Sequence, residues 1–221
     1  MQETNQKFEF VEGDVIVIAP GRTVKRIRAL VTIALFGVSP GDLGGYVESV
    51  KNIGLAGDAW VSGDAQVSGD AQVSGDAQVY GDARVYGDAR VSGNARVSGN
   101  ARVYGDARVY GDARVYGNAW VYGNARVYGD ALVSGNARVY GDATKTPIHI
   151  QGLRWGVTIA DTTMVIGCQQ HTITEWHSFD TEIIQAMDSD ALEFWTAYKP
   201  MIFGIAKADS RFVEQELDEV Q

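Results

Sequence analysis

Cysteine and histidine occur close together in one stretch of the 221-residue chain. Cys168, His171 and His177 follow the spacing C-x2-H-x5-H, with Glu175 and Asp180 nearby. Thiolate, imidazole and carboxylate groups bind zinc, so these three residues could form a zinc site with Asp180 as the fourth ligand. A Cys–His pair could equally serve nucleophilic catalysis. Neither spacing is specific, because paired C-x2-C motifs are missing, so we expect ordinary turn or half-buried residues here and no cofactor.

The composition of the chain disfavours a disordered, a disulfide-stabilised and a membrane-spanning protein. Hydrophobic residues make up 45% of the chain, which is enough for a core and disfavours disorder. The single cysteine excludes an internal disulfide. The longest mostly apolar run, Ala29 to Val38, is about half as long as a membrane-spanning helix and lacks the cleavage site of a signal peptide. We therefore expect a cytoplasmic protein without a membrane segment, and a buried strand or short helix in this run.

The net charge of −9 comes from 28 acidic and 19 basic residues, and it is unevenly placed. Residues 1–56 carry six of each sign, and residues 57–143 carry eight arginines against ten aspartates. From Thr144 onward there are five bases against twelve acids. An acidic chain is a poor binder of duplex nucleic acid, because attraction to phosphates requires surplus Lys and Arg. The arginine-bearing middle of the chain could still favour a specific anion.

A six-residue repeat, G-[DN]-A-x-V-[SY], fills the middle of the chain. It begins at Gly57 and holds its register through fifteen consecutive starts to Gly141. The alternation A-x-V indicates a short strand that buries Ala and Val, and Gly followed by Asp or Asn suits a corner. A meander of hairpins fits this pattern poorly, whereas winding in one direction stacks Ala on Ala and Val on Val. The repeat therefore predicts a β-solenoid.

The repeat resembles that of the hexapeptide-repeat superfamily. The resemblance implies a left-handed parallel β-helix of triangular section with three units per coil. On that basis Gly57 to Thr146 forms about five coils, a prism about 24 Å long at the usual spacing between strands. We expect a mainly β protein with an N-terminal β cap (residues 1–56), a β-helix (residues 57–146) and a small C-terminal α+β domain (residues 147–221).

A spacing of 18 residues sorts the outward side chains into columns on three faces. One face carries the longest tyrosine column next to arginines, and its candidate binding residues are Arg84, Tyr86, Arg102, Tyr104, Trp120, Tyr122, Arg138 and Tyr140. Arg and Tyr are enriched at binding hot spots, and Arg binds phosphates bidentately. Stacked Tyr and Arg also simply suit a parallel sheet. Trp60 and Trp120 break the consensus at outward positions, and each is either a contact residue or covered by a flanking domain.

The repeat lacks the residues of enzymes built on this fold. Between Gly57 and Asp142 there is no His, Cys, Glu or Lys. The resemblance implies that acyltransferases of the superfamily use a histidine base and that its carbonic anhydrases bind zinc through histidines. We therefore expect no enzyme. Asp70, Asp88 and Asp106 could bind Ca²⁺, although solvated corner residues are the simpler interpretation.

The flanks are predicted to cover the open ends of the solenoid. In the N-terminal segment, strands are expected at Val15–Ala19 and Ala29–Phe36, and Ile53 and Leu55 are expected to face inward. The expected C-terminal strands are Ile148–Ile150, Leu153–Ala160, Met164–Cys168 and His171–Glu175. The expected helices are Phe179–Met187 and Ala191 to about Glu216, with a bend near Pro200.

Two flanking segments, Gly41 to Ser49 and Met164 to His171, resemble segments of phage and prophage proteins that carry such repeats. This resemblance implies a viral origin without a biochemical role, so the cytoplasm in which we expect the protein is that of a bacterial host. The leading hypothesis is a non-enzymatic interaction protein that binds and inhibits a host defence or regulatory protein. The alternatives are a sponge for anionic nucleotides, a hexapeptide-type acyltransferase and a virion scaffold. A homo-oligomer, dimer or trimer, is expected in any case.

Overall fold

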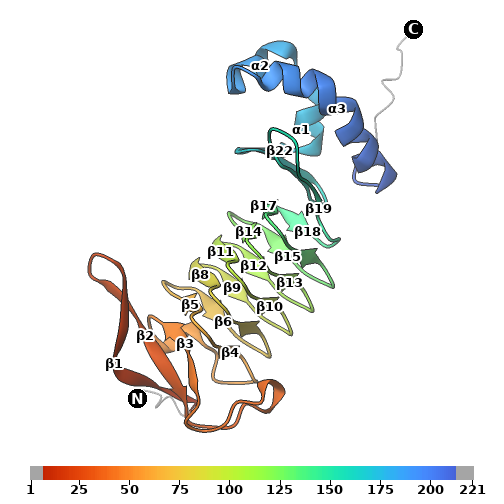
Figure 1. The fold of residues 1–221 in the computed structure, drawn as a ribbon. Helices are drawn as coiled ribbons and strands as arrows, with labels where there is room; N and C mark the ends of the chain where they lie inside the picture. The colour runs from red at the N-terminus through yellow and green to blue at the C-terminus, as the bar shows by residue number, and fades with distance from the viewer. Residues whose placement is uncertain (1–6, 213–221) are drawn as a thin grey trace.

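A computed structural model describes residues 7–212 of the chain. Figure 1 shows a solenoid in the middle, an antiparallel hairpin at its N-terminal end, and a small sheet with helices at its C-terminal end. The predicted mainly β architecture with a solenoid of about five turns is confirmed.

The N-terminal elements are β1 (Phe8–Ala19), β2 (Arg22–Ala29), β3 (Leu43–Val47) and the 3-10 helices η1 (Ala34–Phe36) and η2 (Val50–Asn52). The solenoid strands are β4 (Trp60–Val61), β5 (Gln66–Val67), β6 (Gln72–Val73), β7 (Gln78–Val79), β8 (Arg84–Gly87), β9 (Arg90–Val91), β10 (Arg96–Val97), β11 (Arg102–Gly105), β12 (Arg108–Val109), β13 (Arg114–Val115), β14 (Trp120–Val121), β15 (Arg126–Val127), β16 (Leu132–Val133), β17 (Arg138–Val139) and β18 (Asp142–Ala143). The C-terminal elements are β19 (Ile148–Ile150), β20 (Val157–Ile159), β21 (Thr163–Ile166), β22 (Gln169–Thr172), α1 (Ile173–Ser178), α2 (Thr181–Met187) and α3 (Ala191–Ala208).

Each repeat strand pairs in parallel with the strand three units further along the chain. Arg84 lies opposite Arg102, and Val85 lies opposite Val103, at the predicted separation of 18 residues. The pairing gives three sheets, one of them in the order β1-β2-β3-β5-β8-β11-β14-β17 and the others five-stranded. The N-terminal hairpin is therefore continuous with one face of the solenoid.

The repeat glycines are needed at the corners. Their φ angles between Gly57 and Gly135 are 63° to 74°, in the region that L side chains rarely adopt. A Cβ on Gly99 would also approach the backbone nitrogen of Gly117 to 3.1 Å. Inside the coils, the Ala and Val of the repeats are 0 to 2% exposed and form one continuous column of apolar side chains. This core is built only from contacts between neighbouring coils.

The N-terminal segment covers the first coil. Asn52 is fully buried, and its Nδ2 donates hydrogen bonds to the carbonyls of Gly69 and Ala71 at 3.0 and 2.8 Å. Glu48 accepts a hydrogen bond from the backbone nitrogen of Gly69 at 2.6 Å. These contacts satisfy polar backbone groups that an uncovered coil would leave unpaired.

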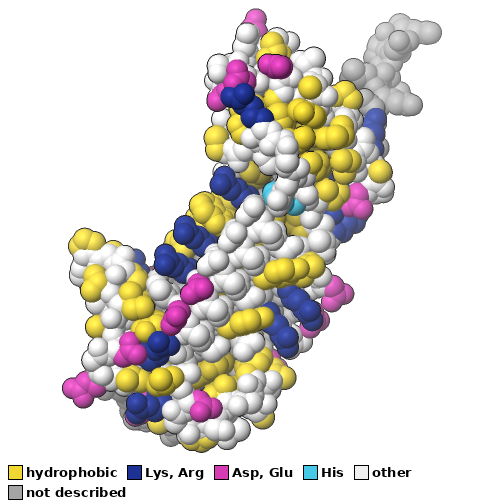
Figure 2. All heavy atoms as spheres, in the orientation of Figure 1, with side chains coloured by type: hydrophobic (Ala, Val, Ile, Leu, Met, Phe, Trp, Pro, Cys, Tyr) yellow, Lys and Arg dark blue, Asp and Glu magenta, His cyan; other side chains and the backbone are white. Residues whose placement is uncertain are grey.

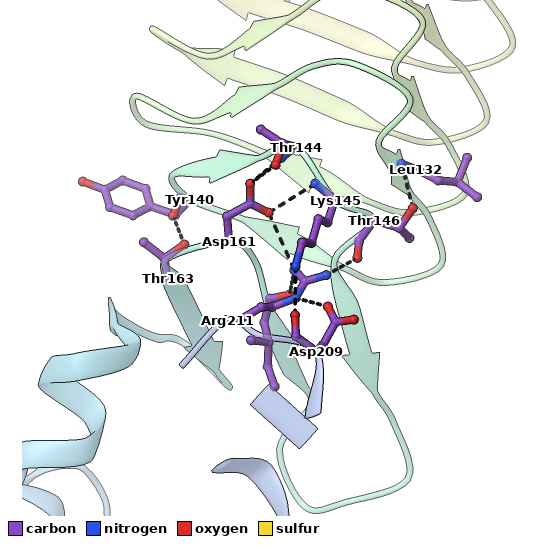
Figure 3. A network of polar contacts seen from close by, with 10 residues as sticks. Leu132, Tyr140, Thr144, Lys145, Thr146, Asp161, Thr163, Asp209 and Arg211 are labelled. Carbon is purple, nitrogen blue, oxygen red and sulfur yellow. Dashed lines mark hydrogen bonds and ion pairs between the residues drawn. The ribbon is translucent and has the colours of Figure 1, made fainter. Parts of the chain in front are cut away.

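The C-terminal segment covers the last coil in a comparable way (Figure 3). The Thr163 hydroxyl donates to the carbonyl of Tyr140 at 2.6 Å, and Asp161 accepts hydrogen bonds from the backbone of Thr144 and Lys145. Arg211, which follows α3, donates to the carbonyl of Thr146 at 2.8 Å. The polypeptide after α3 thus returns to the end of the solenoid.

Several predicted element boundaries are wrong. The run after Ala29 is mostly irregular and contains η1. Leu30, Val31 and Leu35 are exposed, whereas Ile33 is buried and Phe36 and Val38 pack against the core while half-buried. Leu55 is 46% exposed instead of inward, whereas Ile53 is buried opposite Val73.

The predicted strand His171–Glu175 is also wrong, because the chain turns into α1 at Ile173. The Thr172 hydroxyl accepts from the backbone nitrogen of Glu175, and the Glu175 carboxylate accepts from the backbone nitrogen of Thr172. This capping box starts a helix that the alternating pattern concealed. The long C-terminal helix is α3, which contains Pro200 and ends at Ala208. The rest of its predicted range, from residue 213, lies outside the described residues.

Candidate functional site

The predicted binding residues lie on one face of the solenoid. We call this surface the tyrosine face and define it by strands β5, β8, β11, β14 and β17, which are consecutive in one sheet. All eight candidate residues belong to these strands or directly follow them, as the spacing predicts: Arg84, Tyr86, Arg102, Tyr104, Trp120, Tyr122, Arg138 and Tyr140. Tyr140 differs from the other tyrosines in the orientation of its ring.

Three tyrosine rings form a stacked ladder. The ring centroids of Tyr86 and Tyr104 are 5.0 Å apart with an angle of 1° between planes, and those of Tyr104 and Tyr122 are 5.4 Å apart at 12°. Tyr140 tilts by 45° relative to Tyr122 because its ring lies over Gly123, where a Cβ would approach it to 2.2 Å. The ladder therefore exposes ring edges and hydroxyls, while most ring faces are occupied by one another.

Arginine and tryptophan form the neighbouring column. Trp120 lies between Arg102 and Arg138, whose guanidinium carbons are 5.1 and 5.0 Å from its ring centroid. Arg138 also donates a hydrogen bond to the carbonyl of Gly167 at 3.2 Å. Within residues 7–212, Arg84, Arg102 and Arg138 form no ion pair with a carboxylate. Their charge is available to an external anion.

The ladder hydroxyls are neutral at physiological pH. Burial raises the pKa of Tyr86, Tyr104 and Tyr122 above the ordinary value of 10.0, although nearby arginines act in the opposite direction. Neutral hydroxyls can donate as well as accept hydrogen bonds. The surface consequently combines fixed positive charge with neutral donors.

Each end of the tyrosine face opens into a hollow. At the N-terminal end, a cleft of about 480 Å³ separates the hairpin β1–β2 from the solenoid, and its walls include Ile16, Ile18, Arg22, Arg84 and Tyr86. Figure 2 shows basic and hydrophobic side chains alternating along the side of the solenoid that the hairpin and the C-terminal domain enclose. No sequence pattern identified the hairpin residues as part of a site, since the pattern of a strand does not predict where a hairpin lies in the fold.

The C-terminal hollow has a volume of about 570 Å³ and is lined by Arg138, His149, Arg154 and Trp155, among others. His149 Nδ1 is 2.9 Å from the Thr158 hydroxyl, and its buried Nε2 has no hydrogen-bond partner among the described residues. Burial lowers the pKa of His149, so its ring is neutral near pH 7. Arg154 is already paired with Asp190.

The two tryptophans of the repeat have different environments. Trp60 is 1% exposed and belongs to the same buried cluster as Phe8 and Ile27 of the N-terminal segment. A Cβ on Gly44 of β3 would lie 2.8 Å from the Trp60 ring. Trp60 is therefore covered by the flanking domain and is unavailable as an external contact, whereas Trp120 is half-buried on the tyrosine face.

The residues of the Cys–His stretch lie in separate local environments in the described part of the chain. Cys168 is exposed in the turn between β21 and β22. The ring of His171 lies 4.8 Å from that of Phe179, and the ring of His177 lies 4.8 Å from that of Phe212. Both histidines thus pack among aromatic side chains.

The acidic residues beside these histidines serve as helix caps. Glu175 completes the capping box of α1, and the Asp180 carboxylate accepts from the backbone nitrogen of Ile183 at 2.9 Å at the start of α2. In the part of the chain that the structure describes, no three His, Cys, Asp or Glu side chains gather closely enough to hold a metal ion. Asp70, Asp88 and Asp106 accordingly form no such group.

The fold and the comparisons agree on the class of protein. The chain contains a β-solenoid of about five turns with covered ends. Its repeats match the sequence model of the YdcK Beta solenoid repeat in seven overlapping segments: residues 65–81, 77–93, 89–105, 95–109, 107–123, 119–135 and 125–141. No curated protein matches the chain. None of the helices within residues 7–212 is long and apolar enough to cross a membrane.

Proposed function

We propose that the protein is a non-enzymatic binding protein whose tyrosine face docks an acidic surface of a protein partner. The observation that carries this proposal is the row Arg84, Arg102 and Arg138, which has no carboxylate partner among the described residues and lies beside a ladder of stacked tyrosines. Opposite charge on the partner would complement this row.

The arrangement is suited to binding because it is rigid before contact. Each tyrosine ring is held by its neighbours at about the spacing of the strands, and Trp120 is held between two guanidinium groups. Side chains that are already ordered lose little conformational freedom on association. Tyr, Trp and Arg are also the residues that most often dominate the energy of protein interfaces.

The position of the face supports a partner of defined shape. The hairpin β1–β2 borders the face at one end and the C-terminal domain at the other (Figures 1 and 2). A convex or extended acidic surface would fit between these two ends, and its contact with both would fix its orientation.

The proposed partner is a bacterial host protein of a defence or regulatory system, and the proposed effect is inhibition by covering its surface in the host cytoplasm. The support for this origin is the resemblance of Gly41 to Ser49 and Met164 to His171 to segments of phage proteins. A homodimer or homotrimer would present two or three tyrosine faces and would increase the avidity for the partner.

The test combines capture with reconstitution. The full-length protein is used to capture partners from a bacterial lysate, the recovered partner is purified, and its binding is measured by calorimetry. The test variant carries Arg84→Gln, Arg102→Gln and Arg138→Gln, and the control carries Arg90→Gln, Arg108→Gln and Arg126→Gln on another face of the same solenoid. Native mass spectrometry of the complex gives the stoichiometry.

We expect the tyrosine-face variant to lose at least about tenfold in affinity, since truncated hot-spot residues typically cost more than 1 kcal/mol each. The control variant should bind as the wild type does, and both should retain the wild-type melting temperature within a few degrees. Equal losses in the two variants, or a partner that binds without either set of arginines, would overturn the proposal.

A further inference from the structure

We propose that the cleft between the hairpin β1–β2 and Tyr86 binds a nucleotide, that is, a planar heteroaromatic ring that carries a phosphate group. This is a second site at the end of the tyrosine face, and it does not depend on the existence of a protein partner. The cleft offers one aromatic ring face, one apolar wall and one cation that forms no ion pair with the described residues.

The ring face belongs to Tyr86, the first tyrosine of the ladder. Tyr104 has a ring on both sides, at 5.0 and 5.4 Å, but the ring contact recorded for Tyr86 is with Tyr104 alone. The column position one coil earlier is Ser68, which has no ring, and both Ser68 and Tyr86 line the cleft. A planar ligand ring above Ser68 would continue the stack by one step, in an offset-stacked geometry that aromatic rings favour.

The apolar wall belongs to the hairpin. Ile16 and Ile18 are half-buried and line the cleft, while Val17 between them is 72% exposed. Alternation along β1 thus places the two isoleucines on the side of the solenoid. A ring in the cleft would have Tyr86 on one face and aliphatic side chains on the other, which is how ligand sites commonly hold planar groups.

The cation available to the phosphate is Arg84. Arg22 also borders the cleft, but it is held by Glu48 through two hydrogen bonds of 3.0 and 2.6 Å. Arg84 is exposed and has no ion pair within residues 7–212, and Arg102 lies one coil further along. Arginine binds phosphate through two parallel hydrogen bonds, and Gln66 in the same cleft could accept or donate at the ring edge.

Calorimetry with full-length protein tests the two halves of the ligand separately. The probes are the four ribonucleoside 5′-monophosphates, adenosine as a ring without phosphate, and inorganic phosphate without a ring. At least one monophosphate should bind more tightly than adenosine and inorganic phosphate. If none of the four binds at millimolar concentration, or if inorganic phosphate binds equally well, the proposal is wrong.

Three variants test the location. Ser68→Tyr would fill the ligand position with a protein ring. Because Ser68 is 7% exposed, the melting temperature of this variant is measured first to establish that it folds. Tyr86→Ala removes the stacking face and Arg84→Gln removes the cation. We expect Ser68→Tyr to abolish nucleotide binding. Tyr86→Ala and Arg84→Gln should each weaken it about tenfold or more, because removing an aromatic ring on which a base stacks typically lowers the affinity by about this factor.

The matched controls are Tyr128→Ala and Arg126→Gln, which alter a stacked tyrosine pair and an arginine on a face without the hairpin. They should leave nucleotide binding unchanged. Unchanged binding in a folded Ser68→Tyr protein would overturn the proposed site. Nucleotide binding is measured without any partner, so its failure would leave the protein-binding proposal standing, and the reverse also holds.

Discussion

At the scale of single residues, the same position of the repeat has two different roles. Trp60 and Trp120 both replace the residue between Ala and Val of a unit. Trp60 is buried beneath the N-terminal segment, with its indole nitrogen lacking a hydrogen-bond partner among residues 7–212. Trp120 is half-buried between two arginines on the tyrosine face. The neighbours, and not the repeat, decide whether a tryptophan is core or surface.

Trp60→Ala should therefore destabilise the protein by about 3–5 kcal/mol, because it leaves a cavity in the cluster with Phe8 and Ile27. Trp120→Ala should lower the free energy of unfolding by clearly less, since the Trp120 side chain is already partly exposed to solvent. Chemical denaturation of the two variants measures the difference. Equal midpoints would show that the N-terminal segment does not pack on Trp60 in solution.

The tyrosine ladder predicts a loss of stability at alkaline pH. Unfolded tyrosines ionise near pH 10, whereas burial raises the pKa of Tyr86, Tyr104 and Tyr122 in the folded state. The unfolded chain therefore releases protons first, and stability that is complete below pH 10 should fall as the pH rises through the folded pKa values. The triple Tyr→Phe variant of these residues should show a smaller fall in melting temperature between pH 9 and 11. An identical pH profile would contradict the prediction.

At the scale of elements, the solenoid strands are short and repeat one sequence, whereas each of the two covering segments has a sequence and structure of its own. The Ala and Val alternation of the repeat predicted every solenoid strand, because each coil contacts only a neighbour of the same sequence. The start of α1 was missed because the β-branched residues Thr172, Ile173 and Thr174 are typical of a strand, whereas the capping box at Thr172 starts a helix. The end of the solenoid depends instead on polar contacts between distant residues.

Arg211 should be the residue on which the C-terminal cover depends most. Its side chain is 3% exposed and donates to the carbonyls of Ile159 and Thr146 at 3.0 and 2.8 Å (Figure 3). Arg211→Ala should cost about 1–3 kcal/mol, because the part-buried carbonyl of Ile159 loses its hydrogen-bond donor. It should also increase hydrogen exchange in residues 144–212 more than in the solenoid.

Arg154→Ala is the matched control, since it removes an arginine of the same domain from an exposed pair with Asp190. Exposed ion pairs contribute about 0–1 kcal/mol, so this variant should unfold almost as the wild type does. A loss as large as that of Arg211→Ala, or faster exchange throughout the solenoid, would show that the network is not the determining contact.

At the scale of the whole molecule, the solenoid acts as a spacer that sets the distance and angle between its two covered ends. Three units make one coil, so the number of units decides over which face the C-terminal domain lies. The charge follows the same division, since the twelve acids after Thr144 lie in the C-terminal part and the arginines lie on the coils. The tyrosine face is bordered at both ends only because the count of units brings both ends to the same face.

Deleting residues 93–110 removes one complete coil and should yield a folded protein shorter by about 4.8 Å with both ends on the same face. Deleting residues 93–98 removes one unit and should also fold, because every unit buries the same Ala and Val. In that variant the C-terminal domain should be rotated by about one third of a turn. Small-angle scattering distinguishes the two, and circular dichroism reports folding. Indistinguishable profiles, or an unfolded one-coil deletion, would contradict this account.

The sequence by itself determined the solenoid, its three faces and the stacked columns, because these features repeat between residues 18 positions apart. A local rule applied fifteen times leaves little choice of structure. It also predicted the tyrosine ladder, though not the tilt of Tyr140, which follows from its contact with Gly123.

Only the tertiary structure decided what covers the ends and what lies next to the ladder. The cleft forms because Ile16 and Ile18 lie on the same side as Tyr86. In the Cys–His stretch, the environment of His171 and His177 is set by the aromatic rings that pack against them. These contacts each occur once and join distant parts of the chain, so no periodicity predicts them. The physical reason is that repeated contacts can be predicted from the periodicity of the sequence, whereas contacts that occur once between distant residues depend on packing over the whole fold.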